Sequence, residues 1–334
     1  MNDKDIIETI NDIVWWIPFR KLRDFIRELV YTILEIKELL HFIKELNNNI
    51  DGNRQYIVVQ MSGGFTDQLH HYRLGYSIEK LYNKKVLYDI QWYNYHGKDA
   101  FGKYNRNLDI FNIFDDIHFE TATDNEIQIA KNYFTLIDYK NTDITNIVKY
   151  NKIIYLHSLN LISLNWGMLK TNLININKVF DLDKYILPKL ENDNKSVYDD
   201  IKNCKHSVAC HVRRNDYISV EHRIYSFLDE NYFIKAIEKV NEKIKERLKI
   251  YFFSDDMDWV KNKLIPLIKN KYDYMTVDIN DNDRGYFDFY LISNCKYQIA
   301  SEGGFCRTAY QFNKYKNKIL ITPNDIDKKY IRNK

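Results

Sequence analysis

Apolar residues in the first fifty positions recur at helical spacing. From position 22 onward the spacing alternates between four and three residues, which is the heptad pattern of a coiled-coil seam. The members of this heptad seam are Leu22, Ile26, Leu29, Ile33, Ile36, Leu40 and Ile43. Asparagines at 47–49 and the turn at 51–53 predict the end of the helix and a linker. Residues 1–50 are therefore predicted to form a helical extension.

Three roles are open for this extension. It packs on its own globular domain, it joins copies of the chain in a coiled coil, or it lies on a membrane surface. For the membrane, the candidate contacts are the aromatic run at 15–19 and its basic neighbours Arg20, Lys21, Arg23 and Arg27. Many carboxylates on the same helix disfavour the membrane role.

A strand, a glycine turn, a helix and a second strand follow the linker. Residues 56–61 are a short β-branched run typical of a buried strand, and Gly63 and Gly64 form the turn. An amphipathic helix is predicted over 67–81, with strands at 85–89 and 152–156, whereas 95–150 shows no regular pattern. This order predicts the opening of a doubly wound α/β domain over residues 51–190.

Strands and helices alternate regularly in the last third of the chain. The predicted strands are 206–212, 250–254, 274–277, 297–300 and 318–321, and the predicted helices are 231–248, 257–268, 286–293 and 304–312. Repeated units of this length predict a parallel sheet covered by helices on both faces, in a second domain over 191–334. Ligands of such sheets bind at the carboxyl ends of the strands.

Length and charge narrow the functional classes. A chain of 334 residues suggests about two domains. With 49 Lys and Arg against 46 Asp and Glu, the net charge of +3 argues against a nucleic-acid-binding protein. The four cysteines form no C-x-x-C pair, which argues against structural zinc. Without a signal-peptide pattern or a long apolar stretch, we expect a cytoplasmic location.

Two strand-end loops allow both a functional and a structural interpretation. Gly63-Gly64-Phe65 lets the backbone approach a ligand at a helix N-terminus, and Asp67 is also a good helix cap. Asp255-Asp256-Met257-Asp258 contains a D-x-D of the kind that holds a divalent metal in some sugar-nucleotide enzymes. Because Asp is favoured at helix starts, capping is the preferred interpretation there.

Two further strand-end loops favour anion binding. Arg213 and Arg214 directly follow a buried strand, where Asp216 could hold one of them and leave the other for a ligand. A structural salt-bridge cluster is the alternative. Glu302-Gly303-Gly304-Phe305 runs from a strand into a helix, where backbone N–H groups form an anion nest. Two such loops on adjacent units indicate a diphosphate, and hence a nucleotide or nucleotide-sugar ligand.

Several of these motifs resemble those of the GDP-fucose-dependent fucosyltransferases. The run 211–216 resembles their first arginine motif, and residues 56–75, 251–260 and 288–295 resemble segments of the bacterial α-1,2-fucosyltransferases of glycosyltransferase family 11. The run 305–310 is more similar to the α-1,6-fucosyltransferases. The resemblance spans about 56–325 and leaves out the N-terminal helix.

This resemblance implies a GT-B type fold, with two Rossmann-like domains, and an inverting transferase that needs no metal or other cofactor. It implies that Arg213 binds the β-phosphate, His211 the nucleoside and Asp288 the guanine edge. The loop 302–305 would hold the diphosphate, and Asp216 belongs to the same donor site. A glutamate after the arginine pair is the candidate base, which makes Glu221 the first choice and Asp67 the second.

Departures from the family pattern cluster where sugar and acceptor should lie: Thr66-Asp67, Asn215, and Glu302 in the last loop. The expected reaction is transfer of a deoxysugar, L-fucose from GDP-fucose, to a hydroxyl such as O2 of a galactose-type residue in a bacterial surface glycan. The alternatives are another GDP-sugar of mannose or rhamnose type, and a non-catalytic scaffold for glycan assembly. Expected partners are the GDP-sugar and the glycan, with a homo-oligomer or docking on the inner membrane face through the N-terminal helix.

Overall fold

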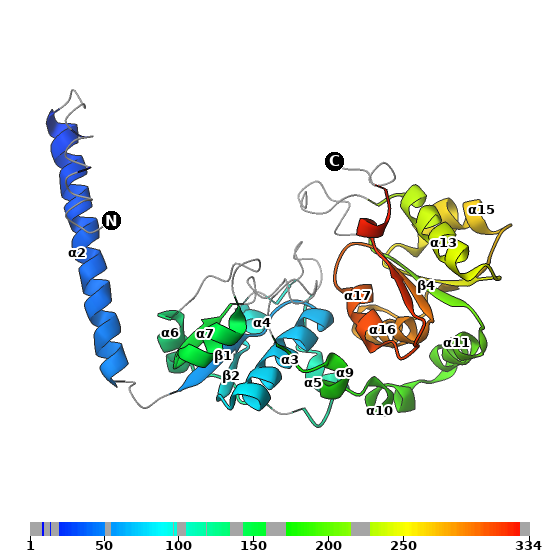
Figure 1. Ribbon diagram of the computed structural model, residues 1–334, viewed down its shortest axis with the longest axis horizontal. Coiled ribbons are helices and arrows are strands. Elements are labelled where there is room, and N and C mark those ends of the chain that lie inside the picture. The colour runs from blue at the N-terminus through cyan, green and yellow to red at the C-terminus, as the bar shows by residue number, and fades with distance from the viewer. Residues whose placement is uncertain are drawn as a thin grey trace.

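Three parts of the chain are visible in the computed structural model (Figure 1). The structure describes residues 9, 14, 20–50, 55–95, 97–98, 105–117, 119–133, 143–157, 172–214 and 228–327. A single long helix is followed by a domain around a three-stranded sheet and then by a domain around a five-stranded sheet. The predicted α/β class with a helical extension is confirmed. The predicted boundaries at 50 and 190 stay predictions.

The long helix α2 (Arg20–Ile50) extends away from both sheets (Figure 1). At 31 residues it is about 46 Å long. It does not pack on its own globular body, so the first of the three roles considered for it is not the one seen. Among the helices that the structure describes, none combines the length and apolar character needed to cross a bilayer.

The first domain is built on a parallel sheet in the order β2-β1-β3. Its strands are β1 (Tyr56–Gln60), β2 (Val86–Asp89) and β3 (Ile153–Leu156). The helix α3 (Phe65–Tyr82) connects β1 to β2. The predicted strand, glycine turn, helix and strand are thus confirmed.

The segment 95–150, for which no regular pattern was predicted, contains short helices. The helices that follow β2 are α4 (Gln91–Tyr95), α5 (Ile110–Ile113), α6 (Asp124–Lys131) and α7 (Ile144–Tyr150). Each is too short to show an amphipathic period in the sequence. At α6 the start was readable, because Thr123 and Glu126 form a capping box.

The second domain contains a parallel sheet in the order β6-β5-β4-β7-β8. Its strands are β4 (Ser207–Val212), β5 (Lys249–Ser254), β6 (Asp273–Val277), β7 (Tyr297–Ala300) and β8 (Ile319–Ile321). The chain moves outward from β4 to β6 and then returns to β7 on the other side of β4. This reversal opens the ligand crevice of doubly wound sheets between the carboxyl ends of β4 and β7.

Helices cover both faces of this sheet, and two of the predicted ones end or change character early. They are α11 (Asn192–Asn203), α13 (Glu230–Ile244), α14 (Met257–Trp259), the π-turn η3 (Val260–Leu264), α15 (Ile265–Ile268), α16 (Gly285–Asn294) and α17 (Phe305–Phe312). The helix predicted over 231–248 ends at Ile244, where Lys245 adopts a left-handed conformation. The helix predicted over 257–268 is interrupted before Pro266, which has no N–H for the regular helical hydrogen bond.

The two domains share one hydrophobic core. Ile57 and Leu74 of the first domain belong to the same buried cluster as Tyr251 and Phe289 of the second. The connection between the domains consists of α9 (Ile176–Val179), α10 (Leu182–Tyr185) and η2 (Leu187–Lys189). Two further short turns are η4 (Asn282–Arg284) and η5 (Pro323–Asp325). The continuous core places the carboxyl-end loops of both sheets at the domain junction.

Candidate active site

His211 and Ser301 connect the carboxyl ends of β4 and β7. Ser301 follows β7, and its Oγ accepts a hydrogen bond from the backbone N of Arg213 at 3.1 Å. The same Oγ lies 3.3 Å from Nδ1 of His211. Burial, with a smaller effect from the Arg213 charge, lowers the pKa of His211 to about 3, so the imidazole is neutral at pH 7. Its uncharged ring suits contact with a nucleoside better than with a phosphate.

Arg213 is fixed by a carboxylate and remains partly open. Its Nη1 lies 3.0 Å from Oδ2 of Asp255, and its side chain is 31% exposed. The second oxygen of Asp255 accepts a hydrogen bond from the backbone N of Arg214 at 2.8 Å. Within the part that the structure describes, Asp255 thus performs the holding role expected of Asp216, which lies outside the described residues. A guanidinium held in this way is preorganised for an anionic ligand.

Arg214 is a structural residue, although it is adjacent in sequence to Arg213. Its side chain is nearly buried, its Nε lies 3.2 Å from Oδ2 of Asp256, and its guanidinium lies 3.9 Å from the ring centroid of Trp259. The other oxygen of Asp256 accepts a hydrogen bond from the backbone N of Trp259 at 3.1 Å and caps α14. The capping interpretation of 254–258 is confirmed.

The N-terminus of α17 adjoins this strand edge. Gly303 has a φ of +96°, which side chains rarely adopt, and Gly304 caps α17 without a side-chain hydrogen bond. The ring of Phe305 stacks on His211, with centroids 5.2 Å apart. Burial raises the pKa of Glu302, and the positive charge of Arg307 lowers it. Arg307 therefore offsets the repulsion that Glu302 would exert on a diphosphate.

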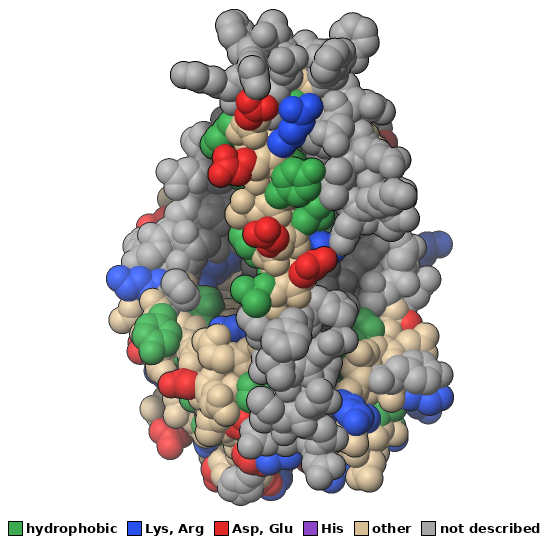
Figure 2. All heavy atoms as spheres, turned by 90° about the vertical axis from the view of Figure 1, so that its left-hand side faces the viewer, with side chains coloured by type: hydrophobic (Ala, Val, Ile, Leu, Met, Phe, Trp, Pro, Cys, Tyr) green, Lys and Arg blue, Asp and Glu red, His purple; other side chains and the backbone are tan. Residues whose placement is uncertain are grey.

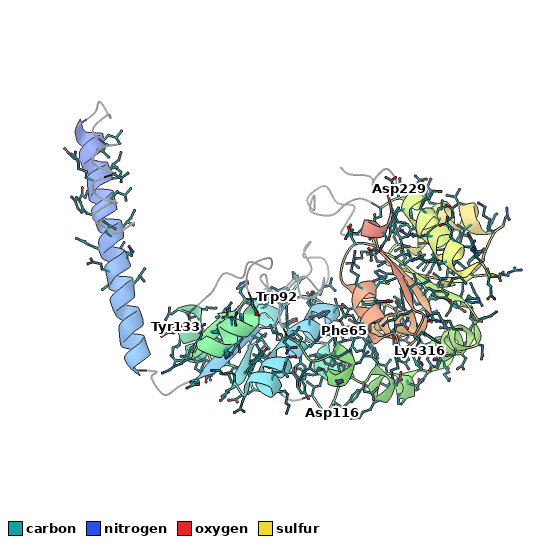
Figure 3. The ribbon with its side chains drawn as sticks, viewed as in Figure 1. Phe65, Trp92, Asp116, Tyr133, Asp229 and Lys316 are labelled. Carbon is teal, nitrogen blue, oxygen red and sulfur yellow. The ribbon has the colours of Figure 1, made fainter. Side chains whose placement is uncertain are left out.

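Aromatic rings connect this loop to the other domain. Phe305 meets Phe289 edge to face at 5.4 Å, and Phe289 meets Phe65 edge to face at 5.3 Å. Phe65 begins α3, and it lies at the junction between the domains (Figure 3). The structure therefore brings together the loops 63–65, 211–213 and 301–305, which are far apart in the sequence.

Asp67 caps the helix α3. One carboxylate oxygen accepts a hydrogen bond from the backbone N of Gly64 at 3.0 Å. Gly63 has a φ of +77°, and a Cβ there would lie 2.4 Å from the Asp67 carboxylate. The capping interpretation is thus observed, and the role of Asp67 as a base stays a prediction. Glu221, the first candidate base, lies outside the described residues.

Asp288 has one oxygen bound and one available. Oδ1 accepts a hydrogen bond from Nδ2 of Asn280 at 2.6 Å, and Asn280 also exchanges hydrogen bonds with Asn194. Burial raises the pKa of Asp288 to about 7, although the Asn280 hydrogen bond opposes the shift. No described residue bonds to Oδ2, so this oxygen is open to a ligand donor.

Three residues of the site were missed in the sequence. Ser301 and Asp255 are polar residues directly after strands β7 and β5, and that position was the available signal. His70 on α3 lies 3.0 Å from the Thr308 hydroxyl on α17 and joins the two domains. Burial lowers its pKa to about 3. Only the fold makes this contact visible, because 238 residues separate its partners.

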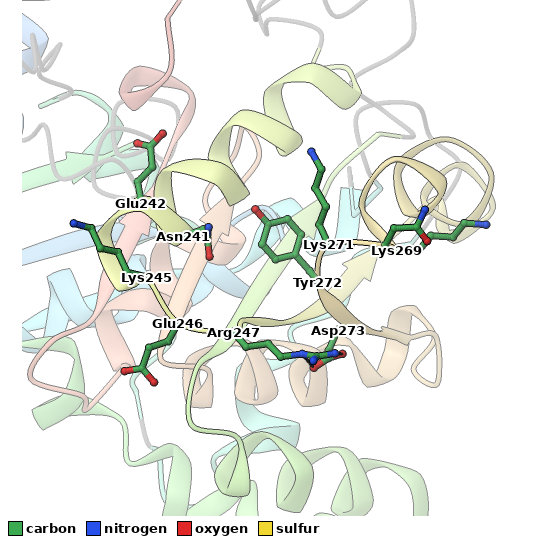
Figure 4. A pocket seen from close by; sticks show the side chains of 10 residues that line it. Asn241, Glu242, Lys245, Glu246, Arg247, Lys269, Lys271, Tyr272 and Asp273 are labelled. Carbon is green, nitrogen blue, oxygen red and sulfur yellow. Dashed lines mark hydrogen bonds and ion pairs between the residues drawn. The ribbon is translucent and has the colours of Figure 1, made fainter.

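A large surface hollow lies at the opposite end of the five-stranded sheet. It is formed by residues 241–247 and 269–273, next to the amino ends of β5 and β6 (Figure 4). Its charged side chains include the Arg247–Asp273 pair, which is bonded at 2.7 and 2.6 Å. None of the predicted site residues lines this hollow.

The chain resembles curated proteins over part of their length. It is 31% identical over 126 residues to an alpha-1,2-colitosyltransferase of Escherichia coli, which is 37% of this chain and 42% of that protein. It is 28% identical over 119 residues to the O-antigen biosynthesis glycosyltransferase WbnK of Escherichia coli, which is 35% of this chain and 38% of that protein. Both matches thus span less than half of the relative's length.

Solved structures and a family model complete the comparison. The fucosyltransferase NodZ from Bradyrhizobium gives a TM-score of 0.37 at 11% identity, over 77% of this chain and 93% of that one. A NodZ alpha-1,6-fucosyltransferase soaked with GDP-fucose gives 0.38 at 12% identity, over 78% and 93%. The model of glycosyl transferase family 11 matches residues 111–334, more than half of the sequence. The chain therefore belongs to glycosyl transferase family 11.

Proposed function

We propose that the protein is an inverting, metal-independent glycosyltransferase that moves a deoxysugar, L-fucose, from GDP-fucose to a hydroxyl of a bacterial surface glycan. The observation that carries the proposal is the meeting of Arg213, the glycine turn at 303–304 and Phe65 at one domain junction. A donor held at the second domain would there present its sugar to an acceptor held at the first. Family membership supports the reaction class.

The chemistry of the step fits these groups. Glycosyl transfer builds positive charge on the sugar ring and negative charge on the departing diphosphate. Arg213 and the first N–H groups of α17 stabilise the negative charge without a metal ion. A base must take the acceptor proton as the C–O bond forms, and we propose Glu221 for it, with Asp67 as the second choice.

The names of the relatives bear on the linkage and on a second donor. One relative is named as an alpha-1,2 enzyme, which supports transfer to O2 of a galactose-type residue. The same name carries colitose, so a colitose donor is the second candidate function. Donors of the mannose or rhamnose type are further alternatives with less support from the similar proteins.

A donor panel tests the proposal. We expect GDP to bind in a calorimetric titration, and GDP-fucose to be hydrolysed or transferred faster than GDP-colitose, GDP-mannose or GDP-rhamnose. Addition of EDTA should leave the rate unchanged. A different preferred donor would correct the sugar, whereas absence of both GDP binding and turnover would favour the non-catalytic scaffold.

Asp288 makes GDP binding dependent on pH. The guanine edge donates hydrogen bonds, so it binds the ionised carboxylate, which predominates above the pKa of about 7. GDP affinity should be constant above pH 8 and fall by nearly tenfold per pH unit below pH 6. Titrations of wild type and Asp288→Asn with GDP at several pH values measure this. An unchanged pH profile in Asp288→Asn would contradict the assignment.

We propose that α2 joins copies of this chain. Most of its heptad seam is open to solvent: Leu29 is 48%, Ile33 55%, Ile36 51% and Leu40 53% exposed. Green side chains mark this apolar surface between the charged ones (Figure 2). A second copy offers the same repeat, and consecutive isoleucines at core positions favour more than two strands. Because α2 extends from the body, several copies can pair without a clash of their domains.

Sedimentation equilibrium tests this role. Wild type should sediment as an oligomer, and the double variant Ile33→Asp, Ile36→Asp as a monomer with unchanged domain unfolding. The control Glu35→Gln, Glu38→Gln changes side chains off the seam and should remain oligomeric. A monomeric wild type would contradict the proposal, and recovery of that monomer with anionic vesicles would favour membrane docking.

A further inference from the structure

The described ionic side chains at the donor-side strand ends balance in sign. Arg213 is paired with Asp255 and Arg214 with Asp256, at 3.0 and 3.2 Å. The next acid and base along the same edge are Glu302 and Arg307, which act on each other electrostatically. A diphosphate brought to this edge adds negative charge that these pairs do not neutralise.

Arg106 of the other domain is a cation next to the same junction. A Cβ added to Gly64 would lie 3.6 Å from Nη1 of Arg106, so the guanidinium covers the glycine turn before Phe65. The side chain is half-buried. Its guanidinium makes no ion pair or hydrogen bond with any residue in the described ranges, and Asp109 is the acid that feels its charge. A half-buried, unpaired guanidinium is costly unless a ligand completes it.

The loop that carries Arg106 is fixed to α3 by one buried side chain. Nε2 of Gln68 donates to the backbone oxygen of Asn107 at 2.8 Å, and Oε1 accepts from the backbone N of Ile110 at 3.1 Å. Gln68 is fully buried and also reaches the oxygen of Gly63. The glycine turn and the Arg106 loop are thereby held as one unit, and Arg106 is preorganised.

This unit faces the donor-side domain. Phe65, next to Gly64, contacts Phe289 of α16 at 5.3 Å between ring centroids. Asp109, three residues after Arg106, is close enough to Asp283 of the second domain for that charge to raise its pKa, in addition to burial. The rings of Phe289, Phe305 and His211 then lead to Arg213.

We propose that Arg106 binds the diphosphate of the donor from the opposite domain. It supplies the positive charge that the paired arginines of the second domain lack, and it couples occupation of the donor site to contact between the domains. The assignment deepens the proposed function and rests on it. The ligand it fits is a nucleoside diphosphate rather than a nucleoside.

Calorimetric titration of the full chain with GDP and with guanosine tests this. In Arg106→Gln the affinity for GDP should fall by about tenfold to a hundredfold, because a charge-assisted contact is lost, while guanosine affinity stays the same. Arg106→Lys should lie between Arg106→Gln and wild type. The control Lys98→Gln removes an equal charge from the same loop, where Lys98 pairs by backbone with Asn105, and should bind GDP as wild type does.

Each contrary result has a distinct meaning. Unchanged GDP affinity in Arg106→Gln, with wild type binding GDP, overturns the Arg106 assignment and leaves the proposed function intact. An equal loss for GDP and guanosine also overturns it, because the residue would then act on the nucleoside site or the fold. Absence of GDP binding in wild type overturns the proposed function itself, and with it this inference.

Discussion

Replacing Arg213 with alanine is expected to lower the rate of sugar transfer by about a hundredfold to a thousandfold, the cost of removing one preorganised group from a developing anion. The variant loses the guanidinium and also leaves Asp255, previously paired at 3.0 Å, facing the departing diphosphate. Steady-state assays of transfer and of donor hydrolysis measure the effect. The fall should appear in kcat as well as in kcat/KM, because the charge grows in the transition state.

Arg247→Ala is the matched control for this variant. Arg247 also pairs with an aspartate, Asp273, through two hydrogen bonds, but it lies in the surface hollow at the opposite end of the sheet (Figure 4). Its removal should leave the transfer rate unchanged. Activity of Arg213→Ala within a few fold of wild type would exclude Arg213 from leaving-group stabilisation.

Replacing Arg214 with alanine is expected to destabilise the fold by about 2–3 kcal/mol. The variant leaves Asp256 without its partner and exposes the face of Trp259 on which the guanidinium lies at 3.9 Å. We place the value below the range for fully buried pairs because the Asp256 side chain is 28% exposed. The free energy of unfolding, measured with urea, tests this.

The same control separates the two arginines. Exposed pairs such as Arg247–Asp273 contribute at most about 1 kcal/mol, so Arg247→Ala should unfold close to wild type. Arg214→Ala that keeps its fold at low temperature should retain Arg213-dependent turnover. An unfolding midpoint equal to that of wild type would show that Arg214 is not the structural member of the pair.

Most of the fold could be predicted because its elements are local. Strands such as β1 and β4 are continuous apolar runs, and their position before glycine or arginine loops identified the edge where ligands bind. The short helices of 95–150 were missed because a few turns carry no readable period. The interruption before Pro266 was readable in principle, since proline removes a helical donor.

The sequence by itself determined the alternation of strands and helices, the loops that carry chemistry and the heptad seam of α2. These follow from short-range periodicity and from residue chemistry. Only the tertiary structure decided that Asp255 holds Arg213, that Arg214 is nearly buried against Trp259, and that Phe65 reaches the donor side. Such pairings join residues on different strands and domains. Their partners are chosen by sheet order and packing, for which spacing along the chain holds no record.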